Sequence, residues 1–303
     1  MMRIRTVLND LVPEALGVTD SHDHLFFRSA LIPGQELDDE AAAIAEVRAF
    51  ADTGGQAIVQ WTPHGLNRRA GLLPGISTAT GVSIVAATGL HRCEHYPDGY
   101  VDKVRDQLAE IFVRELTDGI GDTAIRAGLI KVAGGFHVLD AHAELVMRAA
   151  AEAHHATNAP IAVHHELGSA ADAVLDLLVD TLGVHPGAVI LGHLNRFPDH
   201  RGHLELAERG AWLAFDGPSR ANNATDPRLT DCLAALIDAG YADRLLLGGD
   251  TTTARARSTA EGPGMPYLLT HLRPRITRYF GADVADAVFR NNPARAFATD
   301  WRA

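Results

Sequence analysis

One segment of the sequence, Ala127-Gly128-Leu129-Ile130-Lys131-Val132-Ala133, contains the pattern that decides the fold. Its apolar residues are interrupted by a single charge, which is typical of a strand buried on both faces of a parallel sheet. A segment with helical spacing follows at 141–156. Parallel α/β folds are built from this unit, because the helix covers the sheet and leads the chain to the next parallel strand.

The same unit recurs along the whole chain. Runs of strand length lie at 18–25, 57–62, 82–90, 127–133, 161–165, 188–193, 212–216 and 244–250. Helical spacing lies between them at 39–52, 101–116, 141–156, 170–182 and 227–239. Eight such units in 303 residues predict an α/β fold, the (β/α)8 or TIM barrel. A doubly wound open sheet is the alternative, although no glycine-rich phosphate-binding sequence follows the first strand. Because no linker or repeat interrupts the pattern, we expect a single domain over 1–303, with a long active-site loop at 251–266.

Composition excludes several classes of protein. Hydrophobic residues make up 47% and charged residues 21% of the chain, so it is neither disordered nor a disulfide scaffold. The excess of 38 acidic over 27 basic residues argues against a nucleic-acid partner. No apolar run reaches the roughly 20 residues of a membrane span, and residues 1–17 lack the apolar core of a secretory signal. The two cysteines show no CxxC pairing. We therefore expect a soluble cytoplasmic protein without a membrane partner, in which 16 histidines require an explanation.

The first predicted strand ends in Ser21-His22-Asp23-His24. Residues two apart on a strand project to the same face, so His22 and His24 can point together into the mouth of a barrel. Two imidazoles so placed form half of a metal site suited to Zn, Fe, Mn or Co. A pair of polar histidines at a strand end, without a metal, is the other interpretation of this motif taken alone.

Other strands add candidate ligands at the end where a TIM barrel carries its active site. Lys131 lies within an apolar strand, where an ammonium is costly unless it is paired or neutralised. It either forms a salt bridge or reacts with CO2 to give a carbamate that can bridge two metal ions. Later strands end in His164-His165, His193 and Asp250. Strand alternation lets only one of His164 and His165 face the barrel axis. Taken together, these positions predict a metal site.

The order of these motifs resembles that of the phosphotriesterase family of the amidohydrolase superfamily, including its lactonase members. The resemblance extends from about residue 4 to residue 298. The stretches that carry it are residues 17–25, Ala86-Ala87-Thr88-Gly89, Ile130-Lys131-Val132, Ala162-Val163-His164, Gly192-His193, Phe215-Asp216-Gly217, Asp250 and Asn292-Pro293-Ala294-Arg295.

This resemblance implies a binuclear metal centre in a distorted barrel and a homodimer. Zinc is the usual metal, with Mn2+, Co2+ and Fe2+ as alternatives. His22, His24 and Asp250 would hold the more buried ion. His164, favoured over His165, and His193 would hold the more exposed one. A carboxylated Lys131 and a hydroxide would bridge the pair. The hydroxide would attack the substrate, and Asp250 would pass its proton to the departing oxygen. Asp216 is expected to hydrogen-bond a ligating histidine.

Three stretches point to a lactone as the small-molecule substrate. Residues 195–199 resemble the DRNPD sequence of lactonase-like members, and residues 262–269 resemble the GPGxDYLL segment of members associated with phosphorylated sugar lactones. Arg255 and Arg257 lie in the loop where those relatives carry phosphate-binding residues, unless they are solvated loop charges. Arg196 and His91 are further candidate substrate contacts, although His91 is equally compatible with a surface position.

Two departures from the family pattern weigh against an efficient triesterase. Gly217 and Arg196 stand where organophosphate hydrolases carry the His and Asp of a proton relay. We therefore predict a hydrolase that opens a lactone, such as a sugar lactone or a phosphorylated sugar lactone. A phosphoester, carboxyl ester or amide hydrolase on the same metals is the alternative, and a catalytically silent scaffold is a more remote one.

Overall fold

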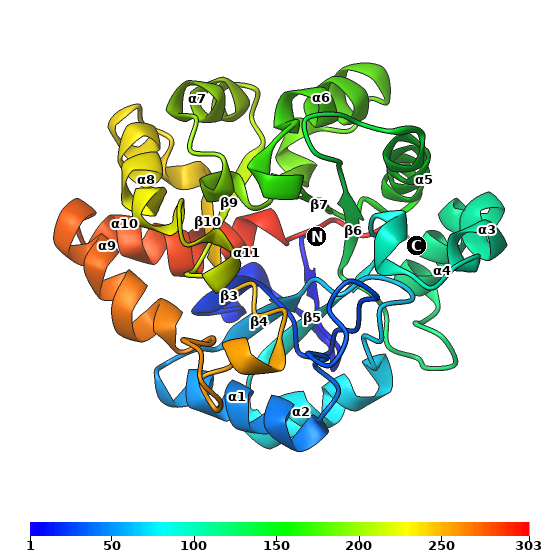
Figure 1. The fold of residues 1–303 in the computed structure, drawn as a ribbon, viewed down its shortest axis with the longest axis horizontal. Helices are drawn as coiled ribbons and strands as arrows, with labels where there is room; N and C mark the ends of the chain where they lie inside the picture. The colour runs from blue at the N-terminus through cyan, green and yellow to red at the C-terminus, as the bar shows by residue number, and fades with distance from the viewer. Residues whose placement is uncertain (303) are drawn as a thin grey trace.

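The computed structural model describes residues 1–302 and contains the predicted barrel. Eight parallel strands follow one another around a nearly closed sheet in the order of the sequence, with helices outside them (Figure 1). The strands are β3 (Thr19–Asp23), β4 (Ala57–Gln60), β5 (Ser83–Thr88), β6 (Leu129–Ala133), β7 (Ile161–His164), β8 (Val189–Leu191), β9 (Trp212–Asp216) and β10 (Leu245–Gly248). All eight predicted strands are present, so the prediction of a TIM barrel is confirmed. A short antiparallel hairpin, β1 (Ile4–Arg5) and β2 (Asp10–Leu11), precedes them and was not predicted.

The strands are mostly shorter than predicted at their carboxyl ends. Two of the residues that end the predicted runs have left-handed backbone conformations, His193 with φ of 64° and Asp250 with φ of 52°. An extended strand cannot continue through such a residue. The chain therefore leaves the sheet at the positions where the polar side chains begin.

The barrel closes between β10 and β3, next to two predicted ligands. The backbone N–H of Asp250 donates to the carbonyl oxygen of His22 at 3.0 Å. At Gly248 an added Cβ would lie 2.5 Å from the Cβ of His22, so only glycine permits this approach. On the other side of β3, a register shift between Asp20 and Asp23 interrupts the pairing with β4 and makes the barrel irregular there.

Helices cover the outside of the sheet, apart from the last one, whose Ala296 packs with the apolar cluster inside the barrel (Figure 1). They are α1 (Glu40–Asp52), α2 (Leu73–Thr80), α3 (Tyr100–Val104), α4 (Leu108–Thr117), α5 (Ala141–Thr157), α6 (Ala171–Leu175), α7 (His200–Glu208), α8 (Leu229–Asp238), α9 (Arg273–Phe280), α10 (Ala282–Asp286) and α11 (Asn292–Ala296). The predicted helix at 101–116 is divided in two by a 3₁₀ turn at Arg105–Gln107, and the one at 170–182 ends in a π-helical turn at Asp176–Thr181. Segment 251–266 is irregular apart from a 3₁₀ turn at Ala254–Ala256.

Alternation along the strands decides which side chains face the barrel axis. Leu129, Ala162 and Ala214 belong to the apolar cluster inside the barrel, whereas their sequence neighbours pack against the helices. Two residues farther along the same strands come Lys131, His164 and Asp216. Because residues two apart share a face of a strand, these three side chains point inward above the apolar plug.

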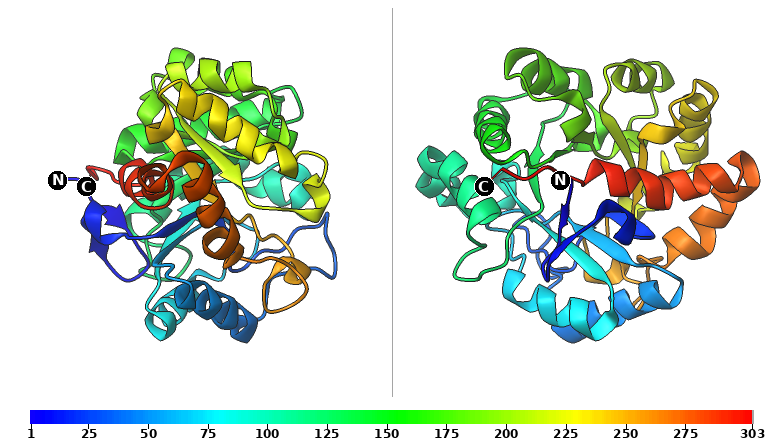
Figure 2. Two further views of the ribbon diagram at one scale, coloured as in Figure 1. Left: turned by 90° about the vertical axis from the view of Figure 1, so that its left-hand side faces the viewer. Right: turned by 180° about the vertical axis from the view of Figure 1, so that it is seen from behind.

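Both chain ends lie at the end of the barrel opposite the loop that follows β10 (Figure 2). Arg3 and Thr299 form an isolated antiparallel bridge there. Within residues 1–302, none of the helices has the length and apolar character needed to cross a bilayer.

A buried ion pair ties α4 to the barrel. The carboxylate of Glu115 accepts hydrogen bonds from Arg68, from Thr88 at the end of β5, and from His64 Nδ1 at 3.0 Å. Burial by itself raises the pKa of this carboxyl, but the His64 hydrogen bond and the Arg68 charge outweigh it and lower the pKa of Glu115 to about 2. The carboxylate therefore stays ionised where an unpaired acid would be protonated.

We expect Glu115→Gln to lower the free energy of unfolding by about 3 kcal/mol at pH 7, because Arg68 is left as a buried charge without its partner. The folded-state pKa of Glu115, about 2, lies below the ordinary value of about 4.3. The stabilisation is therefore complete above pH 4.3 and is lost as the pH falls toward 2. Urea unfolding of both proteins between pH 7 and pH 3 measures the difference. A difference in stability between Glu115→Gln and wild type that stays constant over this range would contradict the prediction.

The double variant Arg68→Met/Glu115→Leu is the control. It removes both charges and is expected to lose less stability than Glu115→Gln.

Candidate metal centre

The carboxyl ends of the strands enclose a cavity of about 260 Å³. All six side chains predicted as metal ligands line it, together with two of the predicted substrate contacts. These are His22, His24, His91, Lys131, His164, His193, Arg196 and Asp250. Residues separated by more than two hundred positions in the sequence therefore surround one space.

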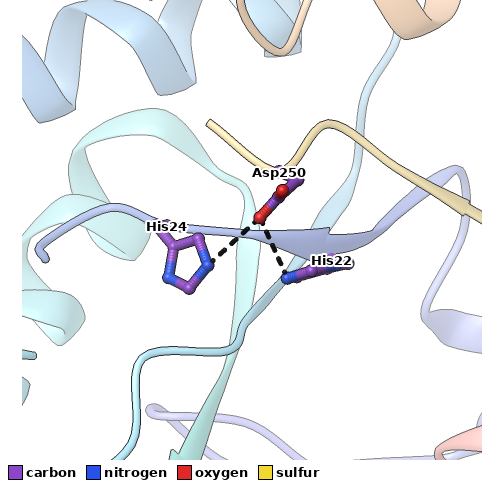
Figure 3. Close-up of side chains that lie close together, drawn as sticks. All are labelled: His22, His24 and Asp250. Carbon is purple, nitrogen blue, oxygen red and sulfur yellow. Dashed lines mark ion pairs between the residues drawn. The ribbon is translucent and has the colours of Figure 1, made fainter. Parts of the chain in front are cut away.

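Three of these side chains form a compact group at the seam of the barrel. Nε2 of His22 and Nε2 of His24 lie 3.4 Å and 3.5 Å from Oδ1 of Asp250. Figure 3 shows both imidazoles, from the β3 segment, on either side of the carboxylate that follows β10. The ring of Trp61 stacks on the imidazole of His22, with centroids 3.8 Å apart, and so restricts the position of that ring.

Asp216, at the end of β9, fixes the orientation of two of the histidines, as the sequence predicted for one. Its carboxylate contacts Nδ1 of His22 at 3.2 Å and Nδ1 of His193 at 2.5 Å. An ionised carboxylate can only accept hydrogen bonds, so both Nδ1 atoms carry the proton. In the neutral imidazole, a proton on Nδ1 leaves Nε2 as the nitrogen that can bind a cation.

Thr62 has the corresponding role for His24. Its hydroxyl donates to the carbonyl oxygen of Phe26 at 2.6 Å or to Gln60 Oε1 at 2.9 Å, which uses its one proton. The hydroxyl oxygen, 2.8 Å from Nδ1 of His24, must therefore accept from that nitrogen. This leaves the Nε2 lone pair of His24 directed at Asp250.

Two imidazole lone pairs and a carboxylate oxygen thus converge with no proton between them. Three acceptors this close repel one another unless a cation lies among them, and neutral imidazole with carboxylate is a donor set that divalent transition metals bind. Burial lowers the pKa of His24 to about 4, so no proton has to be displaced near neutral pH. The residues present therefore fit a metal ion.

His164, and not its neighbour His165, faces the cavity. His165 is fully buried on the outer side of β7, where its Nδ1 lies 3.0 Å from the carbonyl oxygen of Ser169. Nε2 of His164 lies 3.2 Å from Oε2 of Glu166, which accepts its proton and leaves Nδ1 with the lone pair. Strand alternation allowed only one of the two histidines to face the barrel axis, and the family resemblance favoured His164.

Glu166 is a residue of this site that the sequence did not predict. The pKa of Glu166 is lowered to about 2. The hydrogen bond to His164 is the largest cause, and the ion pair with Arg92 contributes to the same shift. Glu166 therefore remains an acceptor for His164 at any pH near neutrality. Its position two residues after His164 was the available signal, but the chain leaves the strand between them.

Lys131 is almost completely buried, with 2% of its surface exposed, on the same cavity. Burial lowers its pKa to about 7, although the charge of Asp250 opposes the shift. A lysine in such a place is neutral in a large fraction of molecules at pH 7, and a neutral amine is the form that reacts with CO2.

Asp250 also pairs with Arg196. While Oδ1 faces the two histidines of the β3 segment, Oδ2 accepts a hydrogen bond from the Arg196 guanidinium. Burial raises the pKa of Asp250, but Arg196 and the neighbouring histidines more than reverse this and hold it well below its usual range. Arg196 thereby keeps this carboxylate ionised.

The other predicted substrate contacts have different environments. His91 is buried beside His164, with ring centroids 4.7 Å apart, and its Nδ1 accepts the N–H of Arg92 at 2.7 Å, so its Nε2 is a donor. Arg255 is exposed and lines a second cavity, of about 220 Å³, that shares Asp250 with the first. Arg257 lines neither cavity. Its guanidinium is buried and donates to the carbonyl oxygen of Leu25, so its position does not support the predicted contact with substrate.

Imidazole and carboxylate groups that converge at the carboxyl end of an irregular parallel barrel are the arrangement expected of a metal-binding TIM-barrel enzyme. The sequence model of the Phosphotriesterase family matches residues 2–297. The chain therefore belongs to the phosphotriesterase family, and the predicted class of enzyme, a hydrolase acting on ester bonds, is confirmed.

Individual relatives agree with this assignment. A phospho-furanose lactonase from Mycoplasmopsis synoviae is 28% identical over 98% of this chain and 92% of its own length. An aryldialkylphosphatase from Saccharolobus solfataricus is 26% identical over 98% of this chain and 100% of its own length. The crystal structure of a lactonase from Listeria monocytogenes has a TM-score of 0.89 at 28% identity, covering 97% of this chain and 98% of the lactonase.

We expect Asp216→Asn to weaken metal binding by about 10- to 100-fold, because an amide cannot accept from both Nδ1 atoms and turns an N–H donor toward one of them. Competition with a chromophoric chelator measures the affinity. Asp226→Asn is the matched control, since that carboxylate accepts the N–H of Ser219 and contacts no histidine of the cavity. Equal affinities of Asp216→Asn and wild type would show that Asp216 does not orient the ligands.

Proposed function

We propose that this protein hydrolyses lactones with two divalent cations held by His22, His24, Lys131, His164, His193 and Asp250. The observation that carries the proposal is that all six side chains line one cavity in a chain of a metal-dependent hydrolase family. When bound, two such cations supply a hydroxide nucleophile near neutral pH and polarise the carbonyl oxygen of the substrate. Zinc is the first choice for an imidazole and carboxylate site, with manganese, cobalt and iron as alternatives.

Lys131 enters this site as a carbamate. The neutral amine attacks the carbon of CO2, and the nitrogen then loses a proton, which leaves an anionic carbamate with two oxygen atoms that can act as ligands. Burial, which lowers the pKa of Lys131 to about 7, supports the first step, and bound divalent cations would stabilise the anionic product.

Asp250 and Arg196 handle charge on the substrate side. Oδ2 of Asp250 can accept a proton and deliver it to the departing alkoxide oxygen of the opened ring. The Arg196 guanidinium donates to Oδ2 of Asp250 and lines the cavity. It can therefore also donate a hydrogen bond to the departing alkoxide oxygen of the substrate. His91 faces the cavity beside His164 with Nε2–H as a donor, which suits a contact with the carbonyl oxygen.

A lactone is favoured over a phosphotriester because two positions of the triesterase proton relay are occupied by Gly217 and Arg196. The phospho-furanose lactonase and the Listeria lactonase support the same choice, whereas the aryldialkylphosphatase supports the alternative. Arg220 and Arg255 are exposed at the second cavity, beside Asp250. Two guanidinium groups there favour a substituent with negative charge, such as the phosphate of a sugar lactone phosphate.

A substrate screen tests the proposal. Metal content by elemental analysis, together with a pH-indicator assay on lactones, sugar lactone phosphates and paraoxon-like triesters, should give about two metals per chain and acid release from one lactone class. Two metals with turnover of esters or triesters alone would transfer the proposal to those substrates. A chain that binds no metal after reconstitution and releases no acid would contradict it and leave the scaffold alternative.

Replacing Lys131 tests the bridge. We expect Lys131→Ala to hold one metal instead of two and to lose about 10²- to 10³-fold in activity, with partial rescue by short carboxylic acids. Lys103 is the other lysine of the chain and is exposed, so Lys103→Ala is the matched control. With two lysines in all, a carbamate signal after labelling with ¹³C-bicarbonate can be assigned by its loss in Lys131→Ala. Full metal content and activity in Lys131→Ala without added acid would exclude the bridge.

A further inference from the structure

A buried glutamate on α1 contacts the loop that follows β10, residues 251–267, here called the β10 loop. Glu46 is fully buried, and its two carboxylate oxygens face this loop. Oε1 accepts the N–H of Ser258 at 3.1 Å and the N–H of Met265 at 2.9 Å. Oε2 accepts the hydroxyl of Ser258 at 2.8 Å and the N–H of Thr259 at 3.2 Å. Both halves of the loop are thereby joined through one side chain.

The number of these contacts distinguishes Glu46 from an ordinary helix residue. A fully buried carboxylate is costly unless hydrogen bonds and charges compensate it. Here the N–H donors come from the loop and not from α1, so the loop and the carboxylate satisfy each other. Hydrogen bonds to an ionised acceptor are about twice as strong as those between neutral groups.

Arg257 forms a second attachment of the same loop. Its guanidinium, 2% exposed, donates to the carbonyl oxygen of Leu25, directly after His24. Burial lowers the pKa of Arg257, and the negative charge of Glu46 partly offsets this effect. The loop is thus connected both to α1 and to the segment that carries two candidate metal ligands.

The two glycines of Gly262-Pro263-Gly264 are required for this arrangement. A Cβ at Gly262 would lie 2.1 Å from the carbonyl oxygen of Ala256. At Gly264, where φ is 58°, a Cβ would lie 2.1 Å from Oε1 of Glu46 and 2.2 Å from the nitrogen of Ser258. The sequence therefore lets the two halves of the β10 loop close around the carboxylate.

The β10 loop forms one wall of the second cavity. Arg255, Gly262 and Tyr267 line this space, and Asp250 lies on both cavities. A substituent of a substrate whose reacting bond is near Asp250 would extend along this wall.

We propose that Glu46 is the positioning residue that holds the β10 loop in the conformation forming this wall, so that the second cavity exists before substrate binds. The loop is then a fixed specificity element and not a lid. Glu46 touches no reacting atom, and it acts only through the loop. The kinetic part of the proposal rests on the proposed lactone hydrolysis, whereas the structural part does not.

Hydrogen exchange measured by mass spectrometry on the full chain tests the structural part. In Glu46→Gln an NH2 group replaces one carboxylate oxygen and faces donors from the loop. We expect exchange of the amides in peptides covering 256–265 to accelerate at least about tenfold, with metal content unchanged. Glu40→Gln, on the exposed first turn of the same helix, is the matched control and should exchange like wild type.

The kinetic test compares a substituted lactone with an unsubstituted one of the same ring. Glu46→Gln should raise KM for the substituted lactone about tenfold while kcat changes less than about threefold, and the unsubstituted lactone should be unaffected. Ser258→Ala/Thr259→Val removes only loop hydroxyls and should shift exchange and KM in the same direction to a smaller extent, which covers the case in which Glu46→Gln does not fold.

Exchange at 256–265 that equals wild type in both variants would overturn the proposal. Faster exchange with unchanged KM for the substituted lactone would overturn the link between the loop and specificity. If no lactone is hydrolysed at all, the proposed function fails, but the exchange result still decides whether Glu46 holds the loop.

Discussion

The carboxylate of Asp216 is the contact on which the candidate centre depends most. It accepts from Nδ1 of His22 on β3 and from Nδ1 of His193 after β8, so one group on β9 sets the orientation of imidazoles from two other strands. Because an imidazole has only two nitrogens, fixing the proton on Nδ1 fixes the lone pair on Nε2. Thr62 does the same for His24, and Glu166 does so from the opposite nitrogen for His164. Each of these four histidines, which line the cavity, is consequently held through one ring nitrogen, which leaves its other nitrogen as the candidate ligand.

The cavity also shows how opposite charges are distributed in a buried site. Arg196 pairs with Asp250 and lies 3.4 Å from Asp216, and Arg92 pairs with Glu166, so these three carboxylates have a guanidinium partner. Lys131 has the charge of Asp250 as its one opposing influence against burial, and its pKa falls to about 7. Among the charged groups around the cavity, Lys131 is therefore the one best suited to react with CO2 and become an anionic carbamate.

In the proposed function, chemistry and specificity occupy different parts of this barrel. The candidate ligands lie at strand ends, where the sheet and the apolar plug of Leu129, Ala162 and Ala214 hold the backbone. The second cavity is formed by loops, with Arg220 and Arg255 on the segments after β9 and β10. Relatives of this chain are named both as a lactonase and as an aryldialkylphosphatase, and a shared fold does not by itself fix the substrate.

The sequence by itself determined the eight strands and five of the helical segments between them, because a strand buried on both faces leaves a continuous apolar run and an amphipathic helix leaves a periodic one. It also indicated the six candidate ligands, since polar residues in or directly after such strands can only gather at one end of the barrel. It missed the hairpin of β1 and β2 and the helices α2, α7, α9, α10 and α11, all of which are short. It also assigned Arg257 to the substrate, because a guanidinium in a loop has the same sequence signal whether it faces solvent, a ligand or a carbonyl oxygen. The tertiary structure alone decided these contacts: Arg257 against Leu25, Arg196 against Asp250, and Glu46 against Ser258 and Met265. Each joins segments distant in sequence, and the distances and proton positions that give them meaning exist only after the chain has folded.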